Sequence, residues 1–156
     1  VRKFRGTGVI VRFIEFMDVG STNGWTKGQV VPTSEIIDFL SSEFDLTPLA
    51  RKSASDVASR WAHSDGSGEI GFISSVSQPF CGDCVRARLS SDGKFFTCLF
   101  TAMGHDMSAL IRSGGETEGL TQSIEEVWSA RKDRYSEERS SGAISLPRVE
   151  MSYIGG

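Results

Sequence analysis

The pattern of hydrophobic and polar residues changes early in the chain. Residues 9–17, VIVRFIEFM, are nearly all apolar and rich in β-branched and aromatic side chains, which predicts a strand buried on both faces in a parallel sheet or barrel. Arg12 and Glu15 interrupt this run, and we expect each to form an internal ion pair with a neighbouring element. Residues 18–28 are rich in Gly, Asn, Ser and Thr and predict a surface loop.

The next segment changes to helical periodicity at residues 32–44. Apolar residues recur every four positions from Ile36 to Phe44, and Thr33 or Ser34 can cap the first turn, so an amphipathic helix is predicted. Beyond it, short apolar runs alternate with turns that contain Ser, Asp and Gly. These runs predict strands near residues 46–51, 58–63 and 69–76.

The second half of the chain begins with a hairpin signal. Asp92-Gly93 separates the runs 85–90 and 95–100, and this dipeptide between two such runs is typical of a β-hairpin. Further on, Asp106 is expected to cap a short helix that ends at Arg112. A longer packing helix is predicted where apolar residues recur at helical spacing, at Leu120, Ile124, Val127 and Trp128. The predicted fold class is therefore α+β.

Composition and charge narrow the functional classes. The chain has 156 residues, of which 38% are hydrophobic, enough for one core of moderate size. A net charge of -3 argues against broad electrostatic binding to nucleic acid or to an anionic membrane. No export signal or membrane-spanning segment is recognisable, and a cytoplasmic location is expected. A homodimer is compatible with these data. Because the chain begins at Val1, we expect it to start inside a longer protein.

The cysteines form the strongest chemical signal. Cys81 and Cys84 form a C-x2-C turn, and Cys98, returned by the hairpin, supplies a third sulfur. The odd number argues against a disulfide framework, and the strand and turn after Cys84 do not suit a thioredoxin-like redox pair. A zinc site would recruit His63 or His105 as its fourth ligand, whereas an iron–sulfur cluster held by three cysteines leaves one iron open. The spacing does not choose between the two metals.

Two arginines follow the second cysteine. Arg86 and Arg88 lie two residues apart in a predicted strand, so they are expected to share one face near the metal ligands. Guanidinium groups bind phosphate oxygens through paired hydrogen bonds, which suggests a nucleotide phosphate as the ligand. The alternative is a pair of solvated arginines on the outer face of the hairpin.

Four segments carry a family resemblance. They are RFIEFMDVG, FISSVSQPFCGDCVRARLSSDGKFFTCLF, RKDRYSEER and the terminal VEMSYIGG. Together they resemble the molybdenum cofactor biosynthesis protein A family, the GTP 3',8-cyclases. The resemblance implies a radical S-adenosylmethionine enzyme with an incomplete α/β barrel and a C-terminal domain that carries a second 4Fe-4S cluster.

The resemblance also implies roles for individual residues. Cys81, Cys84 and Cys98 would hold the second cluster, whose open iron takes the guanine of GTP. The residues that would contact GTP are Arg12, Arg86 and Arg88. This role would replace the ion pair expected of Arg12 and the solvated position considered for the other two arginines. Met17 would line the S-adenosylmethionine site. Gly155 and Gly156 would form a tail that reaches into the barrel and is required for turnover, with Met151, Tyr153 and Ile154 as its buried anchors.

One part of the family pattern is absent from this sequence. Family members carry a C-x3-C-x2-C loop for the cluster that cleaves S-adenosylmethionine, and no such motif occurs here. The chain therefore resembles the C-terminal portion of the enzyme. Residues 1–28 would be the final barrel strand and its following loop, and residues 29–156 the domain that binds the cluster and GTP. We expect this chain alone to be catalytically inactive and its first strand to have an open edge.

Overall fold

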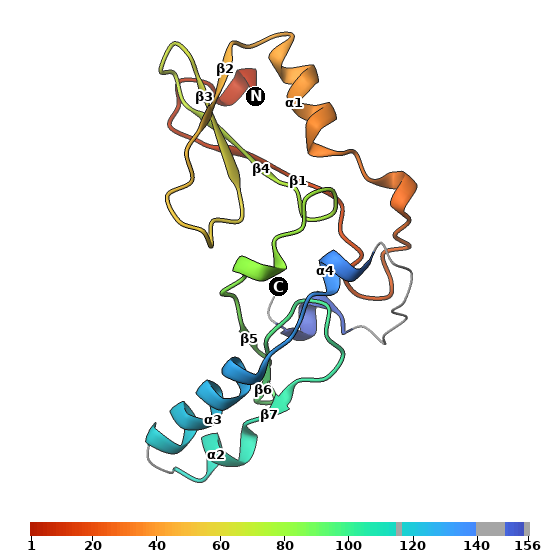
Figure 1. Ribbon diagram of the computed structural model, residues 1–156, viewed down its shortest axis with the longest axis vertical. Coiled ribbons are helices and arrows are strands. Elements are labelled where there is room, and N and C mark those ends of the chain that lie inside the picture. The colour runs from red at the N-terminus through yellow and green to blue at the C-terminus, as the bar shows by residue number, and fades with distance from the viewer. Residues whose placement is uncertain (115–116, 140–148, 155–156) are drawn as a thin grey trace. The chain divides into compact units, whose positions relative to one another are not determined.

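The computed structural model describes residues 1–114, 117–139 and 149–154, and they form a mixture of short strands and helices (Figure 1). This mixture confirms the predicted α+β class. Contacts divide the chain into two units: Val1–Met17 with Trp25–Cys84, and Asp18–Gly24 with the described residues from Val85 onward. No helix in the described ranges is both long and apolar enough to cross a membrane.

The first unit is built around a four-stranded sheet in the order β1-β4-β3-β2. β1 pairs with β4 in parallel, and the other two pairings are antiparallel. Its strands are β1 (Val11–Ile14), β2 (Leu46–Leu49), β3 (Ser59–His63) and β4 (Glu69–Ile73), and its helices are α1 (Thr33–Ser41) and the 3-10 turns η1 (Arg2–Phe4), η2 (Lys27–Gln29) and η3 (Cys81–Asp83). The strands and the helix predicted for this part of the chain are confirmed, with shorter boundaries.

The core of the first unit lies between α1 and the sheet. Leu40 and Phe44, at the end of the amphipathic pattern, pack with Ile70 and Phe72 of β4. Phe72 also stacks on Phe13 of β1, with ring centroids 5.7 Å apart. The helical period of α1 therefore decides which of its residues cover the sheet.

The prediction that the first strand is buried on both faces is wrong for this chain. Along β1, half-buried and exposed residues alternate, and Ile14 is 55% exposed. β1 is an edge strand whose pairing partner lies on one side. An apolar run predicts two covered faces only where other elements are present to cover them.

Glu15 is buried without the ion pair that the sequence suggested. Its side chain is 3% exposed, and its carboxylate accepts hydrogen bonds from the backbone N–H groups of Thr33, Val76 and Ser77 at 2.7–2.8 Å and from the Ser77 hydroxyl. Burial raises the pKa of Glu15, but these hydrogen bonds together outweigh it, and the pKa lies below its ordinary value.

The predicted cap of α1 is wrong, because the Glu15 carboxylate takes the place of a capping side chain within the helix. The helix begins after Pro32, and neither Thr33 nor Ser34 caps it. Instead, the Thr33 N–H donates to Glu15, while the Thr33 hydroxyl accepts a hydrogen bond from Ser74. A carboxylate from another element thus satisfies an N–H group that the helix cannot satisfy itself.

The second unit contains a smaller antiparallel sheet in the order β5-β6-β7. Its elements are β5 (Arg88–Leu89), β6 (Lys94–Phe96), β7 (His105–Asp106), α2 (Ser108–Arg112), α3 (Thr117–Ala130), α4 (Tyr135–Glu138) and the 3-10 turn η5 (Met151–Ile154). The predicted hairpin and both predicted helices are confirmed. Met107 and not Asp106 is the N-cap of α2, although the Asp106 carboxylate accepts the N–H of Ser108. The two-residue strand β7 was not predicted, because it is too short to show a period.

We predict that Glu15→Gln destabilises the protein by about 1.5–3 kcal/mol, since the amide NH₂ group would face N–H donors that now meet a carboxylate oxygen. The folded-state pKa lies below the ordinary value of 4.5, so the stabilisation is present above that pH and is lost as pH falls through the folded-state pKa. Urea unfolding across pH 3–7 measures both effects. Glu35→Gln, at an exposed position in the first turn of α1, is the matched control. Equal stability of the two variants would contradict the prediction.

Candidate metal and nucleotide site

The C-x2-C motif forms one tight turn, as predicted. Cys81–Asp83 is the 3-10 turn η3, and the Cys84 N–H donates to the Cys81 carbonyl at 3.2 Å. Both cysteines are half-buried. The turn follows the loop after β4, whose Val76 and Ser77 N–H groups are bound by Glu15. The sequence just before the cysteine pair is therefore fastened to the end of β1.

Cys98 lies in the second unit, two residues after β6. It is half-buried, and its Sγ accepts a hydrogen bond from the Phe100 N–H at 3.5 Å. The three cysteines all fall within the described residues, and none forms a disulfide. Among the residues described, no three His, Cys, Asp or Glu side chains are grouped so that they could hold a metal.

The two histidines considered as a fourth ligand lie in different surroundings. His63 ends β3 in the first unit, is 4% exposed, and packs edge-on against Phe44 with ring centroids 5.4 Å apart. His105 lies on β7 of the second unit and is exposed. The structure thus shows His63 as a packing residue of the core.

The arginines after Cys84 are not carried by one strand. β5 begins only at Arg88, which pairs with Phe96, whereas Arg86 precedes the strand and is exposed. The predicted strand is therefore shorter than expected and contains only one of the two arginines.

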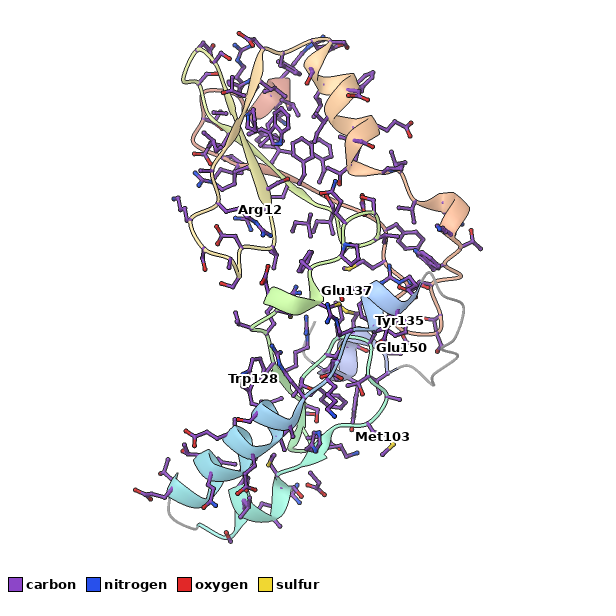
Figure 2. The ribbon with its side chains drawn as sticks, viewed as in Figure 1. Arg12, Met103, Trp128, Tyr135, Glu137 and Glu150 are labelled. Carbon is purple, nitrogen blue, oxygen red and sulfur yellow. The ribbon has the colours of Figure 1, made fainter. Side chains whose placement is uncertain are left out.

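Arg12 lies on β1 opposite Gly71 of β4 (Figure 2). A Cβ atom at Gly71 would lie 3.1 Å from Cγ of Arg12, so the glycine leaves room for the stem of this side chain. Arg12 is exposed, and none of the acidic side chains that the structure describes forms an ion pair with it.

Met17 precedes a loop that belongs to the second unit. Met17 is half-buried, and the loop runs from Asp18 to Gly24. The residues on either side of the loop are joined by a hydrogen bond, in which the Trp25 Nε1–H donates to the Phe16 carbonyl at 2.7 Å. The loop predicted at residues 18–28 is confirmed as far as residue 26, where η2 follows, but Asp18 and Gly20 are buried and not on the surface.

Asp18 is one of these anchors, and sequence reasoning missed it. It is 1% exposed, accepts a hydrogen bond from the Tyr135 hydroxyl at 2.7 Å, and forms an ion pair with Arg139 at 2.9 Å. Figure 2 labels Tyr135 on α4. All of these residues lie inside motifs that carried the resemblance, but nothing in their spacing showed that they meet.

A pocket of about 180 Å³ lies beside Cys98 within the second unit. Phe100 and Tyr135 line it, together with polar side chains that follow Phe100, precede α4 or lie within α4. Those polar residues are Thr101, Lys132, Asp133, Arg134 and Glu138. The pocket offers a cysteine sulfur, two aromatic rings and charges of both signs within one unit.

The segment near the C-terminus is anchored at two points. Glu150, labelled in Figure 2, accepts hydrogen bonds from the Ser21 N–H at 2.9 Å, from its hydroxyl at 2.8 Å and from the Thr22 hydroxyl at 3.2 Å. These hydrogen bonds, the Ser21 N–H first among them, lower the pKa of Glu150. Further along, the Tyr153 hydroxyl donates to Asp92 in the hairpin turn at 2.7 Å.

The predicted tail anchors are confirmed in part. Ile154 is fully buried, whereas Met151 and Tyr153 are half-buried. The proposed catalytic residues Gly155 and Gly156 lie outside the described residues. Glu150, which the sequence did not single out, provides the firmest polar anchor of this segment.

Comparison with known proteins identifies the family. A family model described as Molybdenum Cofactor Synthesis C matches residues 9–137, and the chain belongs to this family. Curated relatives named GTP 3',8-cyclase include one from Xanthomonas campestris pv. campestris (strain B100), 49% identical over 156 residues, and one from Acidothermus cellulolyticus (strain ATCC 43068 / DSM 8971 / 11B), 43% identical over 177 residues. These alignments cover 100% and 97% of this chain but 45% and 49% of the relatives. The chain thus spans about half the length of the relatives it matches. The resemblance that the motifs indicated is confirmed.

We predict that Gly20→Ala loosens the C-terminal segment whereas Gly24→Ala does not. Both glycines have positive φ, at +68° and +59°, so both substitutions carry a backbone cost of about 1–2 kcal/mol. Only at Gly20 would a new Cβ overlap the Glu150 carboxylate, because nothing lies within 4 Å at Gly24. Hydrogen exchange of the Ser21 amide should accelerate in Gly20→Ala beyond the change in Gly24→Ala. Matching exchange rates in the two variants would show that Glu150 does not anchor the loop.

Proposed function

We propose that this chain is the C-terminal half of a GTP 3',8-cyclase, in which it holds a 4Fe-4S cluster and positions GTP. The observation that carries the proposal is a match over its whole length, at 49% identity, to a relative of that name. The activity belongs to the longer protein, because this chain spans about half of its relatives and contains no second set of cysteines.

The donor set supports an iron–sulfur cluster. Cys81, Cys84 and Cys98 are the three cysteines of the chain, and none is held in a disulfide. Of the two histidines considered for a zinc site, His63 packs in the core of the first unit and His105 is exposed on β7. Three thiolates suit a cluster with one open iron, which supplies a coordination position for a substrate atom when bound.

The arginines support a nucleotide ligand. The exposed Arg12 and Arg86 and the half-buried Arg88 are permanently cationic, and Arg86 and Arg88 stand within a few residues of a proposed cluster ligand. In a chain with a net charge of -3, a polyphosphate needs such a local group of cations.

Two further assignments rest on the family alone. We assign Met17 to the S-adenosylmethionine site and the terminal Gly155 and Gly156 to a tail that takes part in turnover. The loop after Met17 and the segment before Gly155 are bound to each other through Glu150, Ser21 and Thr22, which supports a common role for both.

We predict that the anaerobically reconstituted chain binds one 4Fe-4S cluster and that Cys98→Ala abolishes this binding. Elemental analysis of iron, acid-labile sulfide and zinc measures the outcome. Thr101→Ala, which changes a polar side chain in the same pocket, should retain the cluster and serves as the control. Stoichiometric zinc without sulfide would overturn the proposal and favour a zinc-stabilised binding module without catalysis.

A second prediction concerns GTP binding by the reconstituted chain. Arg86→Ala and Arg88→Ala should each weaken binding by about 1.5–3 kcal/mol through loss of a charge-assisted hydrogen bond, with the iron content unchanged. Isothermal titration with GTP gives the affinities. Arg112→Ala, at the exposed end of α2 in the same unit as both arginines, removes an equal charge from a different element and should bind as the parent does. A common loss in all three variants would mean that only net charge matters.

A further inference from the structure

The second unit contains a buried carboxylate, Asp18, that the proposed function does not use. Asp18 is 1% exposed, and removing such a group from water costs several kcal/mol unless partners compensate. Its partners are the Tyr135 hydroxyl at 2.7 Å and the Arg139 guanidinium at 2.9 Å. The three side chains come from the loop after Met17, from α4 and from the residue that follows α4. The two contacts of Asp18 fix the position of α4 against the loop.

The aromatic ring of Tyr135 extends this arrangement towards Cys98. Tyr135 and Phe100 are stacked, with ring centroids 4.6 Å apart and planes inclined by 22°. The guanidinium carbon of Arg139 lies over both rings, 5.1 Å from the centre of Phe100 and 5.5 Å from that of Tyr135. Phe100 is buried by this packing. The Phe100 ring thus contacts Tyr135 and Arg139, and both of these residues bind Asp18.

The backbone of Phe100 contacts the proposed cluster ligand directly. Its N–H donates to Cys98 Sγ at 3.5 Å. Hydrogen bonds to the sulfur ligands of an iron–sulfur cluster withdraw electron density from the cluster and are one of the means by which a protein sets its reduction potential. The orientation of this N–H depends on how the residue is held, and its ring is packed against Tyr135 and Arg139.

We propose that Tyr135 and Asp18 are positioning residues that fix the Phe100 N–H on the sulfur of Cys98 and thereby raise the reduction potential of the cluster. This inference rests on the proposed function, because it requires a cluster at Cys98. The residues are proposed to act through Phe100. The contacts run in one continuous sequence from Asp18 through the Tyr135 hydroxyl and ring to Phe100 and Cys98.

The test is a redox titration of the reconstituted chain, followed by electron paramagnetic resonance. Tyr135→Phe keeps the stacked ring and removes the hydroxyl that binds Asp18. The matched control is Tyr153→Phe, which removes the other tyrosine hydroxyl of the chain, bonded to Asp92 in the hairpin turn. We expect a midpoint potential below that of the parent in Tyr135→Phe and a parental potential in Tyr153→Phe.

A second variant tests the inference independently, in case Tyr135→Phe does not fold. Asp18→Asn combined with Arg139→Gln neutralises both members of the buried ion pair, so that neither charge is left unpaired. It should lower the potential in the same direction. Loss of the cluster in a variant that keeps the parental unfolding temperature also supports positioning of Cys98. Loss of the cluster together with the folded state in both variants would overturn the inference, because the contacts would then serve stability in general.

The remaining outcomes separate this inference from the proposed function. Full cluster content and a parental potential in both variants would overturn the inference alone. A parent chain that takes up no iron and sulfide would overturn the proposed function and this inference together. A shift of equal size in Tyr153→Phe would show that loss of any tyrosine hydroxyl in this unit suffices, which also overturns the role of Tyr135.

Discussion

The carboxylate of Glu15 is the constraint on which the first unit depends. It joins the end of β1, the first turn of α1 and the loop that leads from β4 to the cysteine turn. The first turn of α1 and the loop after β4 carry N–H groups that donate to this one buried anion, which follows β1. Because the anion is hydrogen-bonded on both oxygens, it stays ionised despite its burial.

A second carboxylate plays a comparable part in the second unit. Asp18 lies three residues after Glu15, but it belongs to the loop that packs with α4 and Arg139. Two acidic residues close together in sequence thus organise two different units. The residue proposed for S-adenosylmethionine, Met17, stands directly before the second of them. Its setting therefore depends on contacts made by residues far along the chain.

The proposed ligands and their supports differ in how they are held. Cys81 and Cys84 are placed by local geometry, since η3 brings them onto one turn. Cys98 follows a short ladder, and its surroundings come from aromatic packing with α4. The arginines proposed to bind the nucleotide differ in the same way, because Arg12 lies on β1 and Arg88 on β5, whereas Arg86 lies outside any strand. Binding residues on such segments gain their geometry from the ligand as well as from the fold.

By itself, the sequence determined whatever depends on local periods and on chemical type. The period of α1, the Asp92-Gly93 hairpin and the C-x2-C turn were all predictable, because each depends on residues a few positions apart. The motifs also determined the family, because whole segments matched it. Only the tertiary structure decided that Glu15 caps α1, that β1 has one covered face, and that Asp18 meets Tyr135 and Arg139. These outcomes depend on which distant groups meet when the chain folds, and a buried charge selects partners by geometry and hydrogen-bonding capacity, which spacing along the chain does not encode.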